Sequence, residues 1–180
     1  CAGNPVNDDR LTDDRKSRSI SGSSGPGMSL MRSENKNMGF EVKTLDIRNE
    51  ADVAGCFRLF VILRPHLNEE EFRRRLAIQA AEGYRIVYIE QDGRIAAAAG
   101  CRVASFMAWG KVFYVDDLIA DPELRRAGLG GALLDWLRAE GERLGCDEMH
   151  LDTGYQRQDA HRLYLRKGML FAGHHMALKL

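Results

Sequence analysis

The chain has 180 residues, of which 44% are hydrophobic, enough apolar material for one sizeable core and therefore for a single enzyme-sized domain. Its 26 basic residues balance its 26 acidic ones and are spread along the chain without the aromatic-rich signature of a DNA- or RNA-binding module, so no nucleic-acid partner is expected. No apolar run approaches the roughly 20 residues that a membrane-spanning helix needs, so no membrane segment is expected.

Residues 1 to about 30 differ in composition from the rest of the chain. They contain clusters of acidic and basic residues followed by the Gly/Ser-rich run 21–27, and they have no apolar signal segment. We therefore interpret residues 1–30 as a disordered leader or an added linker, and residues 31–180 as one folded domain.

The next part of the chain predicts one strand and two helices. Apolar residues alternate over 40–44, as in a strand, and the apolar run 51–63 predicts a helix that Pro65 ends. Asn68, followed three residues later by Glu71, predicts a capped second helix that runs to Gly83. The acidic residues 69–71 are explained by the dipole of that helix, with the lining of a substrate cleft as the alternative.

Further strands and helices complete the pattern. Residues 85–90 and 95–102 are predicted strands joined by a tight turn at Asp92-Gly93, and residues 111–119 are a third strand of this group. A short strand is predicted at 148–152, followed by a helix at 160–168. The order of these elements predicts an α/β (α+β) fold, with a mixed sheet and helices.

The clearest functional signal in the chain lies at the end of the predicted strand 111–119 and directly after it. An acidic strand containing Asp116 and Asp117 is followed by an Arg-x-x-Gly-x-Gly pattern, and apolar residues then recur at helical spacing. The residues of the pattern are Arg125, Gly128 and Gly130. The glycines therefore lie at the first turn of a helix.

The first turn of a helix is suited to binding an anion. Its N–H groups have no partner inside the helix, and the helix dipole adds positive charge at the same end. Glycines let a diphosphate approach these N–H groups, and Arg125 and Arg126 add positive charge beside them. Leu133 stands where a dinucleotide-binding fingerprint needs a third small residue, and the chain has no Gly-Lys-Ser/Thr as in an ATP-binding loop. The alternative is a surface turn without a ligand.

Together, these features resemble the GCN5-related N-acetyltransferase (GNAT) superfamily. The resemblance covers about Phe40 to Leu180 and joins the acidic strand, the Arg-x-x-Gly-x-Gly helix start and an Ala-x-x-Leu-Tyr-x-x-x-Gly helix at 160–168. It implies a mixed, mostly antiparallel sheet, splayed at a central strand and flanked by about four helices.

The resemblance also implies acetyl-CoA as the co-substrate. Its pyrophosphate would bind main-chain N–H groups at the helix start, and the thioester oxygen would bind the N–H of Leu118. The family commonly has an asparagine seven residues before the tyrosine of the last motif, where this chain has Arg157. The residues expected at the cofactor are Leu118, Ile119, Arg125, Arg126, Ala127, Gly128, Leu129, Gly130, Gly131 and Arg157.

The catalytic candidates are a tyrosine and two carboxylates. By the resemblance, Tyr164 faces the thioester sulfur, where a phenol with a pKa of about 10 can protonate a thiolate whose pKa is about 8.5. The alternative for Tyr164 is a core aromatic residue with a hydrogen-bonded hydroxyl. Asp116 and Asp117 are candidates for the base that deprotonates the amine. They point to opposite faces of a regular strand, and Asp116 is preferred because a bulge could reverse the facing. The alternative for both is a structural hydrogen bond.

The cysteines and histidines give no signal for a metal or a nucleophile. The cysteines are widely separated and form no Cys-x-x-Cys pair, which favours free thiols in a reducing, cytoplasmic compartment. Adjacent histidines such as His174 and His175 diverge on a strand, which disfavours a shared metal ion. No metal is therefore expected.

The sequence thus predicts a cytoplasmic acetyl-CoA-dependent N-acetyltransferase that acts on a primary amine of a small molecule or a peptide. Two alternatives stay open, a non-catalytic acyl-CoA-binding or regulatory domain, and an acyltransferase with a hydroxyl acceptor or a longer acyl chain. The identity of the amine is left open, and a homodimer is compatible with the resemblance.

Overall fold

The structure is a computed structural model that describes residues 39–124 and 127–180. The expected leader, residues 1–30, and the two arginines Arg125 and Arg126 lie outside the described residues. The elements in chain order are β1 (Val42–Thr44), α1 (Glu50–Leu63), α2 (Glu69–Ala81), β2 (Arg85–Gln91), β3 (Arg94–Phe106), β4 (Gly110–Ala120), a short 3-10 helix (Pro122–Leu124), α3 (Leu129–Arg143), β5 (Glu148–Leu151) and α4 (Gln158–Arg166).

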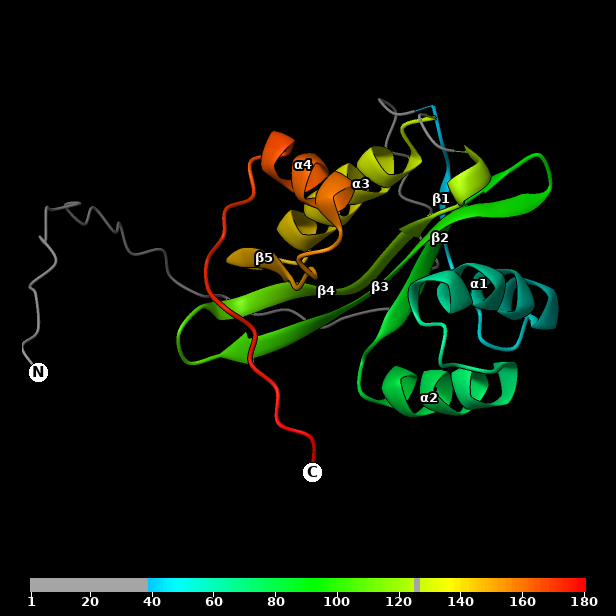
Figure 1. The fold of residues 1–180 in the computed structure, drawn as a ribbon, viewed down its shortest axis with the longest axis horizontal. Helices are drawn as coiled ribbons and strands as arrows, with labels where there is room; N and C mark the ends of the chain where they lie inside the picture. The colour runs from blue at the N-terminus through cyan, green and yellow to red at the C-terminus, as the bar shows by residue number, and fades with distance from the viewer. Residues whose placement is uncertain (1–38, 125–126) are drawn as a thin grey trace, which may run out of the picture. The chain divides into compact units, whose positions relative to one another are not determined.

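The five strands of the described residues form one mixed sheet in the order β1-β2-β3-β4-β5 (Figure 1). The first four strands pair antiparallel, and β5 pairs parallel to β4. With four α-helices in the described residues, this confirms the predicted α/β fold. No helix in the described residues is long and apolar enough to cross a membrane.

Helices cover both faces of the sheet, because strand side chains alternate between the faces. On one face, Val87 and Ile89 of β2 belong to a buried cluster with the apolar side of α3. On the other face, Ile86 and Tyr88 belong to a second cluster with α1 and α2. Figure 1 shows α1 and α2 on one side of the sheet and α3 and α4 on the other. Buried alanines of β3 lie at the centre of the sheet, where small side chains let both layers pack closely.

Local sequence signals begin and end these elements as expected. Asn49 and Asn68 cap α1 and α2, and their side chains accept hydrogen bonds from the N–H groups of Asp52 and Glu71. Asp92 and Gly93 join β2 to β3 with positive φ angles of 53° and 73°, as a tight hairpin turn requires. The predicted first strand is shorter than expected and begins at Val42.

Candidate functional site

β4 and β5 separate part of the way along the sheet. Their pairing ends at Val115 and Leu151, the last residue of β5, whereas β4 continues to Ala120 paired only with β3. From Asp116 to Ala120, the edge of β4 that faces away from β3 is therefore not paired with β5. This is the splay that the resemblance implied.

The hydrogen-bond pattern of β4 shows which backbone groups face this opening. Asp121 N–H donates to the carbonyl oxygen of Ala96 on β3, at 2.8 Å. Backbone groups alternate in direction along an antiparallel strand, so the groups of Leu118 and Ala120 point away from β3. They therefore face the opening. The same alternation turns the backbone groups of Ile119 toward β3, and its side chain packs on the cluster with α1 and α2, so this geometry does not support Ile119 as a cofactor contact.

The chain continues from β4 to the start of α3, where the N–H groups of the first turn have no hydrogen-bond acceptor within the helix. The first helical bond runs from Ala132 N–H to Gly128 O, at 2.9 Å, so the N–H groups of Leu129, Gly130 and Gly131 have no acceptor within α3. Gly128 is the N-cap with φ of 77°, a left-handed conformation that favours glycine. Ala127 precedes it, exposed, and donates its N–H to the Leu124 carbonyl.

The glycines at this helix start are not required by packing. A Cβ atom on Gly128 would have no heavy atom of the described residues within 4 Å, and one on Gly130 would meet, among these residues, only a methyl group of Leu163 at 3.6 Å. Among the described residues, packing therefore leaves room for side chains at these positions. Glycines here are consistent with the expectation that a ligand phosphate approaches the N–H groups closely.

The two carboxylates of β4 lie at a β-bulge. Gly100 pairs with Asp117 and Cys101 with Val115, so Asp116 is the extra residue. In a regular strand the side chains of Asp116 and Asp117 would point to opposite faces, but the bulge makes the strand irregular here. Both carboxylates bind groups that the sequence did not single out. Asp117 accepts from Arg64 Nε at 3.0 Å and from the Tyr84 hydroxyl at 3.1 Å.

Asp116 has a different environment. It is half-buried and pairs with Arg102, whose Nε lies 3.1 Å from Asp116 Oδ2. Burial raises the pKa of Asp116 even though the Arg102 guanidinium acts in the opposite direction. A carboxyl with a raised pKa is a better proton acceptor than an ordinary aspartate.

Tyr164 lies on α4, which packs against the start of α3 through Leu163. Burial raises the pKa of Tyr164, and the positive charge of Arg157 opposes this effect. No hydrogen bond joins the Tyr164 hydroxyl to another described residue, and its role as proton donor, like the alternative of a core aromatic residue, stays a prediction.

A second group of polar residues lies where β5 ends. Asp152 accepts a hydrogen bond from the Tyr114 hydroxyl and pairs with His175 Nδ1 at 3.2 Å. Thr153 Oγ1 is buried and has no hydrogen-bond partner among the described residues. Such an atom needs a partner from solvent or a ligand. The sequence placed this segment at a strand end but could not indicate Tyr114, which is 38 residues away.

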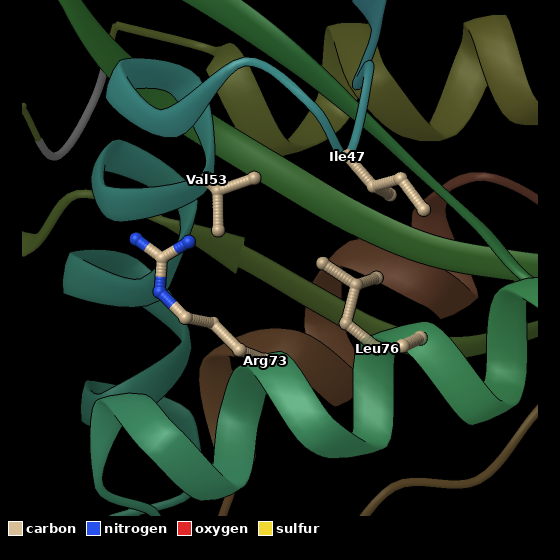
Figure 2. A pocket seen from close by; sticks show the side chains of 5 residues that line it. Ile47, Val53, Arg73 and Leu76 are labelled. Carbon is tan, nitrogen blue, oxygen red and sulfur yellow. The ribbon is translucent and has the colours of Figure 1, made fainter.

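Other candidates have structural roles. In the first turn of α2, Glu69 pairs with Arg73, and Glu71 pairs with Arg74 and Arg75, so these acids belong to the helix surface. Over residues 39–124 and 127–180, no group of three or more His, Cys, Asp or Glu side chains is arranged to hold a metal ion. A small cavity of about 80 Å³ lies between α1 and α2, and no predicted site residue lines it (Figure 2). Its lining residues are Ile47, Val53, Arg73, Leu76 and Ala77.

Comparisons with known proteins agree with this geometry. The family described as "Acetyltransferase (GNAT) family" matches residues 48–169. An uncharacterized N-acetyltransferase of Bacillus subtilis, YhdJ, is 30% identical over 122 residues, which cover 67% of this chain and 86% of that protein.

Solved structures share the fold. An acetyltransferase of Trypanosoma brucei superposes with a TM-score of 0.64 at 24% identity, over 78% of this chain and 99% of that one. The aminoglycoside N-acetyltransferase AAC(6')-Iy, solved in complex with CoA, superposes with a TM-score of 0.67 at 15% identity, over 78% of this chain and 94% of that one.

Proposed function

The chain belongs to the GNAT acetyltransferase family, and from this premise we propose that it transfers the acetyl group of acetyl-CoA directly to a primary amine of a small molecule or a peptide. One observation carries the proposal. The open edge of β4 is followed, after the short connection 121–128, by the N–H groups at the start of α3 that have no acceptor within the helix, so the two features would bind the thioester arm and the diphosphate of one ligand. CoA carries both groups.

The proposed cofactor contacts are mostly main-chain groups. The N–H groups of Leu129, Gly130 and Gly131 would hold the pyrophosphate, with Arg125 and Arg126 beside them by sequence. The N–H of Leu118 would donate to the thioester oxygen and stabilise the negative charge that develops there. Acetyl-CoA supplies an activated acetyl group whose carbon–sulfur bond breaks as the new carbon–nitrogen bond forms.

The side chains of the site would accept one proton from the amine and donate another to the thiolate. Asp116 is the preferred base and Asp117 the alternative, and either would take the proton that the amine loses, directly or through water. Tyr164 would give its hydroxyl proton to the departing thiolate, because a phenol stays protonated at neutral pH. The two transfers account for both protons of a direct transfer from the thioester to the amine, which is the route that we propose.

The acceptor side of the site is of mixed charge. The carboxylates of the bulge attract a cationic amine, while Arg64 and Arg102 compensate part of their charge. A small-molecule or peptide amine fits this environment. We also propose a cytoplasmic location, in line with the buried free thiols Cys56 and Cys101.

Thermal stability in the presence of nucleotides tests the cofactor. At a ligand concentration about 100-fold above the dissociation constant, binding stabilises the native state by about 2.7 kcal/mol, which raises the melting temperature by several degrees. We expect this rise with acetyl-CoA and with CoA, but not with ATP. Acetylation of a panel of amines, followed by the mass increase of the product, then tests the acceptor. A cooperative melt that no CoA species shifts would contradict the proposal.

A substitution at Gly130 separates cofactor binding from folding. Gly130→Ala adds a methyl group at an ordinary contact distance of 3.6 Å from Leu163 and improves the helix propensity by up to about 1 kcal/mol, so the melting temperature of the free protein should not fall. The same methyl group should weaken acetyl-CoA binding at least about 10-fold, because a hydrogen bond to a charged group is worth about 1.5–3 kcal/mol. Calorimetric titration measures the affinity for acetyl-CoA of the Gly130→Ala variant and of the unmodified chain. Unchanged affinity would remove this helix start from the cofactor site.

A further inference from the structure

The loop after β5 carries a polar group that the proposed proton transfers do not use. Asp152, the first residue after β5, accepts a hydrogen bond from the Tyr114 hydroxyl through Oδ2. The same oxygen lies 3.2 Å from Nδ1 of His175. Side chains from β4, from the loop after β5 and from the segment after α4 therefore meet at one carboxylate.

This group lies at the opening between β4 and β5. The last parallel pair of the two strands joins Val115 to Leu151, so Asp116 and Asp152 are the first residues on the two sides of the opening. Next to Asp152, Thr153 has a buried hydroxyl without a hydrogen-bond partner among the described residues, and water or a ligand satisfies such a group. Polar groups thus gather where the two strands separate.

Asp116 and Asp152 are bound from one face of the sheet. Arg102 and Tyr114 are paired neighbours on β3 and β4, and the side chains of such a pair lie on the same face. Arg102 binds Asp116, and the Tyr114 hydroxyl binds Asp152. This face is the one opposite α3, because Phe113, next to Tyr114 in β4, packs in the cluster with α3. An acceptor bound at this group would therefore reach the opening from the face opposite the proposed CoA site.

The segment after α4 is held on the loop after β5 by contacts at several positions. The Phe171 ring lies nearly perpendicular to the His161 ring of α4, with 5.7 Å between their centroids. His174 Nδ1 lies 3.3 Å from the Tyr155 hydroxyl of the loop. Together with the contact of His175 to the carboxylate, these contacts fix where the imidazole of His175 lies.

His175 is oriented as a proton acceptor. An ionised carboxylate only accepts hydrogen bonds, so the neutral imidazole donates to Asp152 from Nδ1 and keeps a lone pair on Nε2. No hydrogen bond joins this Nε2 to another described residue, and the side chain is 67% exposed, so a proton taken at Nε2 can pass to solvent. Burial raises the pKa of Tyr114, so its hydroxyl stays protonated and continues to donate to Asp152.

The charge of Asp152 is available to His175. Within the described part of the chain, no arginine or lysine pairs with Asp152. The arginines of this region bind other acceptors, which are Asp116 for Arg102, Asp117 for Arg64, and for Arg157 the carbonyl oxygen of Leu63, the last residue of α1, at 3.3 Å. The titratable groups on the elements that meet here are Tyr114 and Asp116 of β4, Asp152 and Tyr155 of the loop, His161 of α4, and His174.

A cationic amine loses two protons when it is acetylated. A primary alkyl amine with a pKa of about 10 is an ammonium ion at neutral pH, and its nitrogen has no lone pair with which to attack. One proton must leave before the attack, and a second leaves as the carbon–nitrogen bond forms. The proposed base on β4 takes only one of them.

We infer that His175 is a further catalytic residue, positioned by Asp152, that takes the first proton of a cationic amine at Nε2, directly or through water, and releases it to solvent. This inference rests on the proposed function. The N–H bond of the ammonium breaks, its electron pair stays on the nitrogen, and the Asp152 carboxylate stabilises the imidazolium that forms. The second proton goes to Asp116, and the thiolate takes the proton of Tyr164. Once water has carried the proton of Asp116 back to Tyr164, one proton has been released for each acetyl group transferred.

The first test needs no activity. In nitrogen-15 spectra of the histidine rings, with His175→Gln to assign the signal, the neutral ring of His175 should carry its hydrogen on Nδ1. Asp152→Ala should move the hydrogen toward Nε2, because the hydrogen bond of one ring nitrogen decides which tautomer is present. A hydrogen on Nε2 in the unmodified chain would overturn the inference, whether or not the chain acetylates amines, since Nε2 could then accept no proton.

The second test compares two acceptors at neutral pH. The first is an alkyl amine that the chain acetylates and that is cationic at this pH, and the second is its analogue with fluorine atoms on the neighbouring carbon, which is mostly neutral. His175→Gln should lower kcat/KM about 100-fold for the cationic amine and less than about 2-fold for the neutral one, which has no extra proton to lose. His174→Gln is the matched control, since His174 is exposed and contacts only the Tyr155 hydroxyl among the described residues.

The outcomes are distinct. Equal losses for both amines would mean that His175 supports folding or acceptor binding, and no loss for either would mean that it takes no part, so both results overturn the inference. Asp152→Ala should lower kcat/KM for the cationic amine in the unmodified chain but not in the His175→Gln background, because the carboxylate acts through the ring. Equal losses in both backgrounds would remove Asp152 as the positioning residue. If the unmodified chain binds CoA but acetylates no amine, the proposed function fails as well, whereas loss of the difference between the two amines overturns only the role of His175.

Discussion

Replacement of Tyr164 by phenylalanine is expected to lower kcat roughly 100-fold or more, because the departing thiolate then has no positioned proton donor. The expectation rests on the environment of the residue. Tyr164 is partly buried, its hydroxyl has no hydrogen-bond partner among the described residues, and burial raises its pKa, so the proton stays on the oxygen at neutral pH. Phenylalanine keeps the ring and its packing and removes only the hydroxyl.

The measurement is a steady-state comparison with a saturating amine, together with the dissociation constant of acetyl-CoA. Since only the transition state uses the proton, kcat should fall while the affinity for acetyl-CoA stays nearly unchanged. Tyr155→Phe is the matched control, because Tyr155 is exposed and its hydroxyl contacts only His174 among the described residues. Equal kcat values for the Tyr164 variant and the unmodified chain would exclude Tyr164 as the proton donor.

Replacement of Gly100 by alanine is expected to destabilise the fold by about 2.5–6 kcal/mol. A Cβ atom on Gly100 would lie 1.8 Å from the hydroxyl oxygen of Tyr84 and 2.3 Å from Cζ of the same ring. The ring is 5% exposed and cannot swing away without disturbing the cluster around it. Overpacking of this kind costs about 1–3 kcal/mol, and loss of the Tyr84 hydrogen bond to Asp117 adds about 1.5–3 kcal/mol.

For a chain of this size, such a change corresponds to a fall of roughly 10 °C in melting temperature, measurable by calorimetry. Gly173→Ala is the matched control, because a Cβ at Gly173 would have no heavy atom of the described part of the chain within 4 Å. The variant should also lose acetyl transfer below its melting temperature, since displacement of Tyr84 removes a partner of Asp117 at the bulge. A melting temperature within about 2 °C of the unmodified chain would show that the ring is free to move, because that shift corresponds to only about 1 kcal/mol.

Most of the fold could be predicted from local sequence. The capping residues Asn49 and Asn68, the Asp92-Gly93 turn and the apolar periodicity of α3 each act over a few residues, so the signal and the structure that it causes lie together in the chain. The helix start at Gly128 is likewise a feature that depends on a few neighbouring residues. Its free N–H groups follow from the helix alone, whatever packs around it.

The environments of the catalytic candidates could not be predicted in the same way. The bulge at Asp116 arises from the register of β4 against β3, and no local pattern fixes that register. The partner of Asp117, Arg64 just after α1, is 53 residues away, and the contact between Arg157 and Leu63 spans 94 residues. An arginine that is paired in the fold looks the same in the sequence as one that is exposed.

The sequence by itself therefore determined the elements, the glycine-containing helix start that we propose as the phosphate site, and the identity of the candidate acid and bases. Only the tertiary structure decided where β5 stops pairing with β4, how the carboxylates of the bulge are compensated, and that Arg157 reaches the Leu63 carbonyl. The physical reason is the range of the interactions. Caps, turns and helical periodicity act between neighbours in the chain, whereas burial and ion pairing depend on residues that only folding brings together.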